Sequence, residues 1–155
     1  MSKADQIGFG LIAGALDSRV MVVVPLIPVA GQRIADLAAA VALFAPTFAN
    51  VAHEALRIAH LDREFRLLGL AIAPEAGPHG IDVSLRELIG EALARGARAL
   101  IIAHNHPCGD PTPSRADRIA TRRLVEVARP LEIRLVDHLI FAGDDMISFR
   151  ALGLL

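Results

Sequence analysis

The clearest hydrophobic pattern in the chain is a run of apolar residues at positions 99–103, which no polar residue interrupts. Strands buried on both faces have this pattern, whereas strands with one face in water alternate between apolar and polar residues. Directly before the run, apolar residues recur at helical spacing over residues 84–95, and Gly96 follows. Ser84 and Glu87 have the spacing of a capping box at the first turn of this helix. The pattern therefore predicts a helix that leads into a central buried strand.

Shorter apolar segments upstream predict a β-hairpin, with strands at residues 55–61 and 67–73 and a polar connection between them. The other elements are expected as a strand at 20–24, a helix at 34–44, a loop at 75–82, a helix from Ser114 to about residue 129, and closing strands at 133–141 and 146–149. Helices and strands thus interleave around at least one buried strand. This order predicts the α/β class, with a mixed, mostly antiparallel sheet flanked by helices.

Composition and charge narrow the range of functions. The chain has 155 residues, 54% of them hydrophobic and 21% charged, which is typical of one globular domain. Tyr and Trp are absent and the formal net charge is −1, and both features argue against tight binding to nucleic acid. Arg115, Arg118 and Arg122 would share one helix face. We interpret them as a solvated face in preference to a phosphate or partner-protein patch.

The single cysteine, Cys108, excludes a disulfide within the chain and agrees with a reducing compartment. Apolar stretches at residues 20–30 and 37–52 are too short to span a membrane, and both contain proline. The N-terminus makes a poor signal peptide. We therefore expect a protein located in the cytoplasm, without a membrane partner. The apolar residues 7–51 cover their own core or bury against a second subunit.

The candidate chemistry lies directly after the buried strand. His104 and His106 are two positions apart in an extended segment, so their side chains point to the same face. A Pro- and Gly-rich loop follows, and Asp117 then lies in the first turn of the next predicted helix. Two histidines, one carboxylate and a water molecule form a four-coordinate zinc site of the catalytic kind. The sequence therefore predicts a zinc site at this end of the strand.

Each part of this group also has a simpler interpretation. Ser114 and Asp117 have the spacing of a helix capping box, in which both side chains bind free backbone N–H groups. A His-x-His sequence by itself is more often two polar loop residues. Finding both patterns, joined by one short loop after a buried strand, favours the metal site.

The spacing His-x-His, seven residues, Ser-x-x-Asp is the signature of the JAMM (JAB/MPN) metalloprotease family. Residues 104–107, 109–111 and 113–114 resemble its bacterial RadC-like branch, as does Asp137-His138 in a late apolar strand. The resemblance implies a JAB/MPN sandwich of the cytidine-deaminase-like kind. It also implies a single domain over residues 1–155, with a metal-binding core at 50–150 and a divergent N-terminal segment at 1–49 that lacks the branch's helix-hairpin-helix region.

The same resemblance implies a role for each site residue. His104, His106 and Asp117 would hold Zn²⁺, which can lower the pKa of a bound water from about 15.7 to roughly 7. Glu54 would accept a proton from that water and pass it to the leaving amine, and Ser114 would hydrogen-bond the water or the oxyanion. The implied function is a zinc metallopeptidase or isopeptidase that cleaves an amide bond in a peptide or protein tail.

Several alternatives stay open at this stage. A role in DNA repair or nucleic-acid processing would suit the RadC-like branch, and a non-catalytic scaffold would suit JAMM-type domains that have lost their metal. Cys108 is either a thiolate near the zinc or a small residue in a tight turn. Asp137-His138 is either a pair that orients a metal ligand or a buried histidine with local hydrogen bonds.

Overall fold

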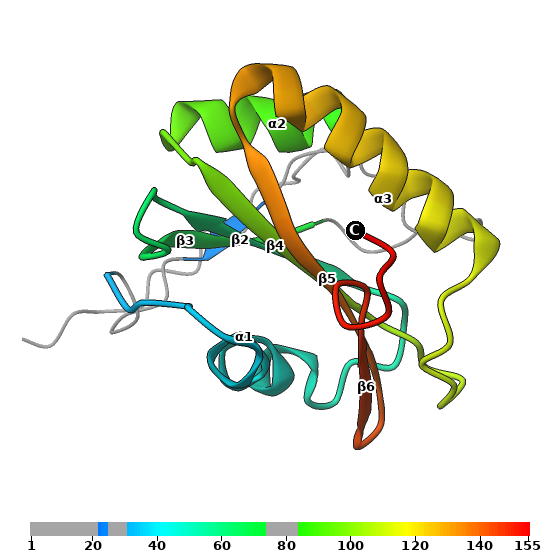
Figure 1. Ribbon diagram of the computed structural model, residues 1–155. Coiled ribbons are helices and arrows are strands. Elements are labelled where there is room, and N and C mark those ends of the chain that lie inside the picture. Colours follow the sequence, from blue (N-terminus) through cyan, green and yellow to red (C-terminus); the bar gives the residue numbers. More distant parts are fainter. Residues whose placement is uncertain (1–21, 25–30, 74–83) are drawn as a thin grey trace, which may run out of the picture.

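The computed structural model describes residues 22–24, 31–73 and 84–155, which form one mixed β-sheet with helices on both faces (Figure 1). The strands are β1 (Val22–Val24), β2 (Leu56–Leu61), β3 (Leu67–Ile72), β4 (Ala99–Asn105), β5 (Arg134–Ala142) and β6 (Asp145–Ser148). The helices are α1 (Leu37–Phe44), α2 (Leu85–Ala94) and α3 (Arg115–Ala128), with short 3₁₀ turns η1 (Ala45–Phe48) and η2 (Arg129–Leu131).

The strands lie in the order β1-β3-β2-β4-β5-β6. Among the described strands β4 and β5 run parallel, and every other neighbouring pair is antiparallel. This arrangement confirms the predicted α/β class and mixed, mostly antiparallel sheet. The predicted hairpin is also confirmed, because β2 and β3 pair in antiparallel register directly across their short connection.

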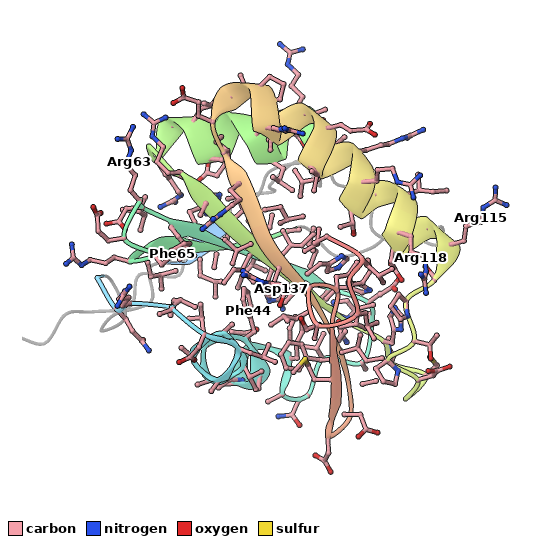
Figure 2. The ribbon with its side chains drawn as sticks, viewed as in Figure 1. Phe44, Arg63, Phe65, Arg115, Arg118 and Asp137 are labelled. Carbon is pink, nitrogen blue, oxygen red and sulfur yellow. The ribbon has the colours of Figure 1, made fainter. Side chains whose placement is uncertain are left out.

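Two hydrophobic layers sandwich the sheet, with α2 and α3 on one face and α1 on the other (Figure 1). The central strand β4 supplies both layers, as its uninterrupted apolar run predicts. Leu100 and Ile102 pack toward α2 and α3, whereas Ile101 and Ala103 pack toward α1. Figure 2 shows Phe44, a fully buried α1 residue, beneath the sheet. The alternation along β4 decides which of its later residues can meet α3.

Two predictions about helix starts are wrong. The first helix begins at Leu37 and not at residue 34, because Asp36 caps it by accepting a 2.8 Å hydrogen bond from the Ala39 amide. Ile34 instead donates its amide to the Phe65 carbonyl at 2.8 Å and is buried under the sheet. Ser84 does precede α2, but its side chain makes no capping hydrogen bond, so the predicted capping box is absent there.

The end of α2 agrees with its prediction, since Gly96 has φ +66°, the left-handed conformation that commonly ends a helix. The predicted loop at 75–82 falls entirely outside the described residues. Within the described parts of the chain, no helix is long and apolar enough to cross a lipid bilayer.

A buried histidine on β2 makes the stability of the metal-free protein depend on pH. Burial lowers the pKa of His60 from 6.5 to about 4, with a smaller contribution from the nearby Arg95 guanidinium. Because the unfolded chain takes up this proton first, the stabilisation is complete above pH 6.5 and is lost as the pH falls toward 4. We expect His60 to account for a loss of about 3 kcal/mol over this range. Urea unfolding of chelator-treated protein at several pH values should show a shallower loss in His60→Leu, and identical slopes would contradict this expectation.

Candidate metal centre

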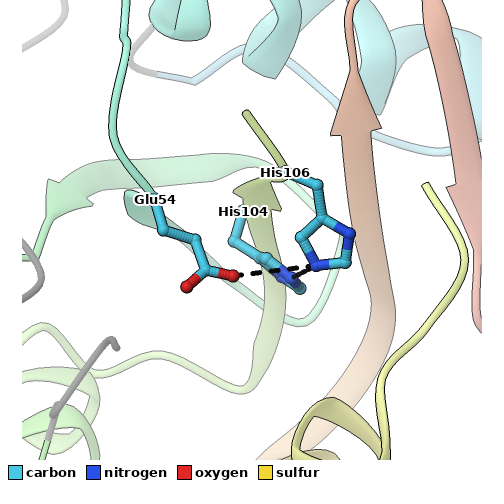
Figure 3. A group of neighbouring side chains, drawn as sticks. All are labelled: Glu54, His104 and His106. Carbon is cyan, nitrogen blue, oxygen red and sulfur yellow. Dashed lines mark hydrogen bonds and ion pairs between the residues drawn. The ribbon is translucent and has the colours of Figure 1, made fainter. Parts of the chain in front are cut away.

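Four polar side chains converge at the carboxyl end of β4: Glu54, His104, His106 and Asp117. The strand register explains how Glu54 reaches the histidines. Leu56 pairs with His104 in the antiparallel β2–β4 ladder, so the same register carried two residues further places Glu54 opposite His106. Residues directly opposite in such a ladder have neighbouring side chains on the same face. Figure 3 shows the Glu54 carboxylate and both imidazole rings turned toward one another.

The two histidines face each other through their Nε2 atoms, which lie 2.9 Å apart. One ligand atom from each of Glu54, His104 and His106 lies within 4.8 Å of the others, so this group can hold a metal ion. His104 is 3% exposed and His106 is partly exposed, which leaves one side of the group open to solvent. The prediction that the His104 and His106 side chains point to the same face is confirmed.

Hydrogen bonds assign the tautomer of His104. The Thr121 hydroxyl donates to the Asp117 carbonyl at 2.6 Å, so it accepts from Nδ1–H of His138, also at 2.6 Å. Burial lowers the pKa of His138 to about 3, so this ring is neutral and its Nε2 is an acceptor. Nδ1–H of His104 therefore donates to it at 2.8 Å. The Nε2 atom of His104 is left with a free lone pair.

His106 reaches the same state by a different contact. Its Nδ1 lies 2.8 Å from the Asp110 carbonyl, and because a carbonyl can only accept, Nδ1 carries a proton. In the neutral imidazole ring, Nε2 is then the atom with the free lone pair. Two bare Nε2 lone pairs thus face each other at 2.9 Å. Burial lowers the pKa of His104 to about 4, so His104 does not supply a proton between them at neutral pH. A metal cation placed between them would satisfy both nitrogens.

Asp117 approaches the histidines from the start of α3. Its Oδ2 accepts the Ser114 amide at 2.7 Å, and the Ser114 hydroxyl accepts the Asp117 amide, so the capping box is formed. Oδ1 takes no part in the cap and lies 3.4 Å from Nε2 of His104, while Oδ2 lies 3.6 Å from Nε2 of His106. The two interpretations of Ser114 and Asp117 are therefore compatible, because the cap itself holds Asp117 toward the histidines.

The charges around this group suit a cation. Burial alone would raise the pKa of Asp117, but the hydrogen bond from Ser114 and the nearby His104 ring outweigh it and hold the pKa below its ordinary value. Asp117 is therefore ionised at neutral pH. A tetrahedral zinc site with Zn–N bonds of roughly 2.0–2.1 Å separates neighbouring ligand atoms by about 3.3 Å. The separations of 2.9, 3.4 and 3.6 Å among His104, His106 and Asp117 lie close to that value, so these residues fit the metal.

An extra residue in β5 brings His138 to this site. The β4–β5 register shifts so that Leu100 pairs with Leu135 and Ile101 with Asp137, which leaves Val136 as a bulge. A bulge of one residue reverses which face the following side chains occupy. His138 consequently points toward α3 and His104, whereas regular alternation would send it to the opposite face. The ring also stacks on Phe149, at 4.4 Å between centroids.

Asp137 does not act as a pair with the His138 ring. Its carboxylate accepts hydrogen bonds from the Ser148 hydroxyl at 2.6 Å and from the backbone amides of His138 and Arg150. It therefore ties β5 to the end of β6 and to the chain that follows β6. Of this pair, only His138 hydrogen-bonds a predicted metal ligand, His104, and it also hydrogen-bonds Thr121.

Replacing His138 by alanine is expected to weaken zinc affinity about 10–100-fold, because Nδ1–H of His104 loses its acceptor and the ring its fixed tautomer. Competition with a chromogenic chelator measures this affinity. His60→Leu, which removes an equally buried histidine elsewhere on the sheet, is the control and should bind zinc as the unaltered protein does. Equal affinities in His138→Ala and the control would contradict the orienting role.

Cys108 lies exposed in the turn after the histidines, where Gly109 donates its amide to the His106 carbonyl at 3.2 Å. Among the described residues, the group able to hold a metal does not include it. The structure thus favours the interpretation of Cys108 as a small turn residue.

Comparison with known families assigns this arrangement. Residues 34–154 match the family model of the RadC-like JAB domain. The chain belongs to the RadC-like JAB domain family. The match covers both layers of the fold and all four converging side chains, and it confirms the resemblance that the His-x-His and Ser-x-x-Asp spacing indicates.

Curated relatives of this RadC-like JAB domain carry the name UPF0758 protein. The chain is 40% identical over 111 residues to one from Symbiobacterium thermophilum, covering 72% of this chain and 47% of that protein. It is 42% identical over 112 residues to one from Bordetella petrii, covering 72% and 50%. To the UPF0758 protein YeeS of Escherichia coli it is 38% identical over 107 residues, covering 69% and 72%. The chain thus spans about half the length of the first two relatives.

Two residues that support the site of this RadC-like JAB domain were missed in the sequence. Thr121 lies four positions after Asp117, and helical spacing alone places both on one helix face. Asn105, between the two histidines, faces the other side of β4 by strand alternation. The position of Thr121 beside Asp117 could therefore have been predicted from the sequence. The partners of Asn105 could not, because they lie in a segment about fifty positions away.

Proposed function

We propose that this protein is a zinc-dependent metallohydrolase that cleaves an amide bond. The observation that carries the proposal is the pair of bare Nε2 lone pairs on His104 and His106, with the carboxylates of Asp117 and Glu54 beside them. Two imidazoles and a carboxylate with an open side are the ligand set of a catalytic zinc, whereas structural zinc sites are closed by cysteines. The RadC-like JAB family membership supports the same conclusion.

In this proposal, His104, His106 and Asp117 hold the metal and Glu54 moves the proton. The carboxylate of Asp117 is fixed by the α3 cap and its side chain is 15% exposed, which suits a ligand. The Glu54 side chain is 36% exposed and lies 3.7 Å from Nε2 of His106, which leaves it free to meet a water and a substrate. Zinc, when bound, lowers the pKa of water and polarises a carbonyl.

Glu54 would take the proton from the attacking water and deliver it to the amine that leaves. A carboxylate can serve as base and then as acid in one cycle, because the proton that it gains in the first step is the one that it loses in the second. Asp117 is less suited to this task, since hydrogen bonds and the His104 ring lower its pKa and hold it as an anion.

Ser114 is proposed to donate its hydroxyl hydrogen to the developing oxyanion. Its oxygen already accepts the Asp117 amide at 3.1 Å, which holds the side chain at the start of α3, while its O–H remains available as a donor. Removing a comparable oxyanion donor in other enzymes costs about 2.7–4 kcal/mol of transition-state stabilisation. The capping role and the donor role therefore use different parts of the same hydroxyl.

The proposed substrate is a peptide or protein tail that passes the open side of the metal centre. Elemental analysis of the purified protein should give about one zinc per chain. The protein should cleave members of a panel of fluorogenic peptidyl-aminocoumarins, lose this activity with a chelator and regain it when zinc is added. A chain that neither contains nor binds a transition metal would overturn the proposal.

A nucleic-acid role is the second candidate, supported by the arginines on the outer face of α3. Arg115, Arg118 and Arg122 are exposed, and none forms an ion pair with a described residue. Figure 2 shows Arg115 and Arg118 on α3. If this face binds DNA, affinity for a duplex will be measurable at low salt and will fall steeply as salt is added. Absence of binding at low salt would remove this candidate.

A further inference from the structure

Asn105 is a buried polar residue between the two histidines, and its side chain points away from them. Alternation along β4 sends His104 toward α3 and Asn105 toward the opposite face of the sheet. Asn105 is 6% exposed, so its amide must find partners inside the protein. Within the described parts of the chain, its side-chain hydrogen bonds all go to one short stretch, residues 51–55, directly before β2.

Three backbone groups of that segment bind the Asn105 amide. Its Oδ1 accepts the amide of Ala55 at 2.8 Å, and its Nδ2 donates to the carbonyls of His53 at 2.9 Å and Val51 at 3.3 Å. Two of these residues flank Glu54 on either side. Asn105 therefore hydrogen-bonds the main chain on both sides of Glu54. The residues next to it in sequence, His104 and His106, carry the imidazoles that face the Glu54 carboxylate.

A second side chain holds the same segment from β2. Arg57 donates to the carbonyl of Thr47 at 3.4 Å and to that of Leu56 at 3.1 Å, and its guanidinium lies over the Phe48 ring. Arg57 is 7% exposed. It contacts residues 47, 48 and 56, whereas Asn105 contacts residues between them, at 51, 53 and 55. The part of the chain that carries Glu54 has no regular secondary structure, so these contacts supply the order that a helix or strand would otherwise give.

We propose that Asn105 is a positioning residue that fixes Glu54 relative to the metal-binding histidines. This inference rests on the proposed function, in which Glu54 moves the proton. Three consecutive residues at the end of β4 and directly after it then carry both histidines and the group that places Glu54. The distance of 3.7 Å between Glu54 and His106 is therefore set from one short stretch of chain. A carboxylate that must meet a water near the metal gains rate from such placement, since a 1 Å displacement can cost about 10²-fold.

The test compares Asn105→Ala with Asp62→Ala as a matched control. Asp62 also clamps main chain with its side chain, accepting the amides of Glu64 and Arg66, but it does so at the far end of β2. Each variant is assayed for zinc content, for kcat and KM on the best aminocoumarin substrate, and for hydrogen exchange of the Ala55 amide by NMR. Asn105→Asp, which keeps an acceptor for Ala55 and loses both donors, serves if the alanine variant does not fold.

In Asn105→Ala we expect kcat to fall about 10–100-fold with KM little changed. Zinc should stay near one equivalent, and the Ala55 amide should exchange faster. Asp62→Ala should keep kcat and the Ala55 exchange rate of the unaltered protein. If kcat in Asn105→Asp returns toward the unaltered value, the Oδ1 acceptor for Ala55 is the contact that matters most. If Asn105→Asp and Asn105→Ala lose kcat equally, the contacts that matter are those that Nδ2 donates to His53 and Val51.

Unchanged kcat in Asn105→Ala overturns the inference, whether or not Ala55 exchange becomes faster. Loss of zinc together with activity also overturns it, since Asn105 would then be supporting the histidines and not Glu54. Failure of the proposed function has a different signature, full turnover in Glu54→Gln. Ala55 exchange does not depend on turnover, so unaltered protection in Asn105→Ala contradicts the clamp even in a protein that cleaves none of the substrates.

Discussion

Replacing Glu54 by glutamine is expected to lower kcat for amide cleavage by about 10²–10⁴-fold while zinc stays bound, because glutamine cannot accept the proton from water. Glu54 lies 3.7 Å from Nε2 of His106 with its side chain partly open to solvent, where a water and a substrate can reach it. The substitution keeps the length and shape of the side chain.

Glu64→Gln is the matched control, since Glu64 is an exposed glutamate in the β2–β3 connection, away from the metal centre. Its kcat and zinc content should equal those of the unaltered protein. Undiminished turnover in Glu54→Gln would refute the assignment of Glu54. Loss of zinc in that variant would instead make Glu54 a metal ligand, as its place in the group with His104 and His106 permits.

Replacing His104 by alanine is expected to reduce bound zinc from about one equivalent to near zero and to abolish amide cleavage with it. Three observations place His104 at the centre of the site. It is 3% exposed, its Nε2 faces both His106 and Asp117, and its Nδ1 is held by His138. The remaining imidazole and carboxylates form an incomplete ligand set. Elemental analysis after dialysis measures the zinc content directly.

The same substitution tests the hydrogen-bond chain behind the metal. Without His104, Nε2 of His138 loses its donor in a buried place, and an unsatisfied buried group costs about 1–3 kcal/mol. Metal-free His104→Ala should therefore unfold at a lower urea concentration than the metal-free unaltered protein. His60→Leu, which keeps the whole chain of contacts, should retain about one zinc. Full zinc content in His104→Ala would refute this site.

The elements of the fold that were predicted correctly are those whose pattern is local. The run at residues 99–103 has no polar position, so burial on both faces follows from its composition. The hairpin of β2 and β3 has two apolar segments and a short polar connection. The start of α1 was predicted wrongly because Ile34 reads as helical and is instead held by the Phe65 carbonyl, a contact with no local signal.

The site divides in the same way. The pairing of His104 with His106 follows from the two-residue period of a strand, and the place of Asp117 follows from a short loop and a helix start. Glu54 could be chosen only by resemblance to a family, because its partner lies 52 positions away. The antiparallel β2–β4 register supplies the reason, since it sets Glu54 opposite His106.

The sequence by itself determined which ligand types are present and where: two histidines and a carboxylate after a buried strand, at a spacing that allows them to share one cation. The tertiary structure decided which atoms take part, because the tautomers depend on contacts from other elements. Thr121 and His138 orient one ring, and the Asp110 carbonyl orients the other. A bulge at Val136 turns His138 to the correct face. Such contacts depend on strand register and on which faces meet, and neither is encoded in local spacing.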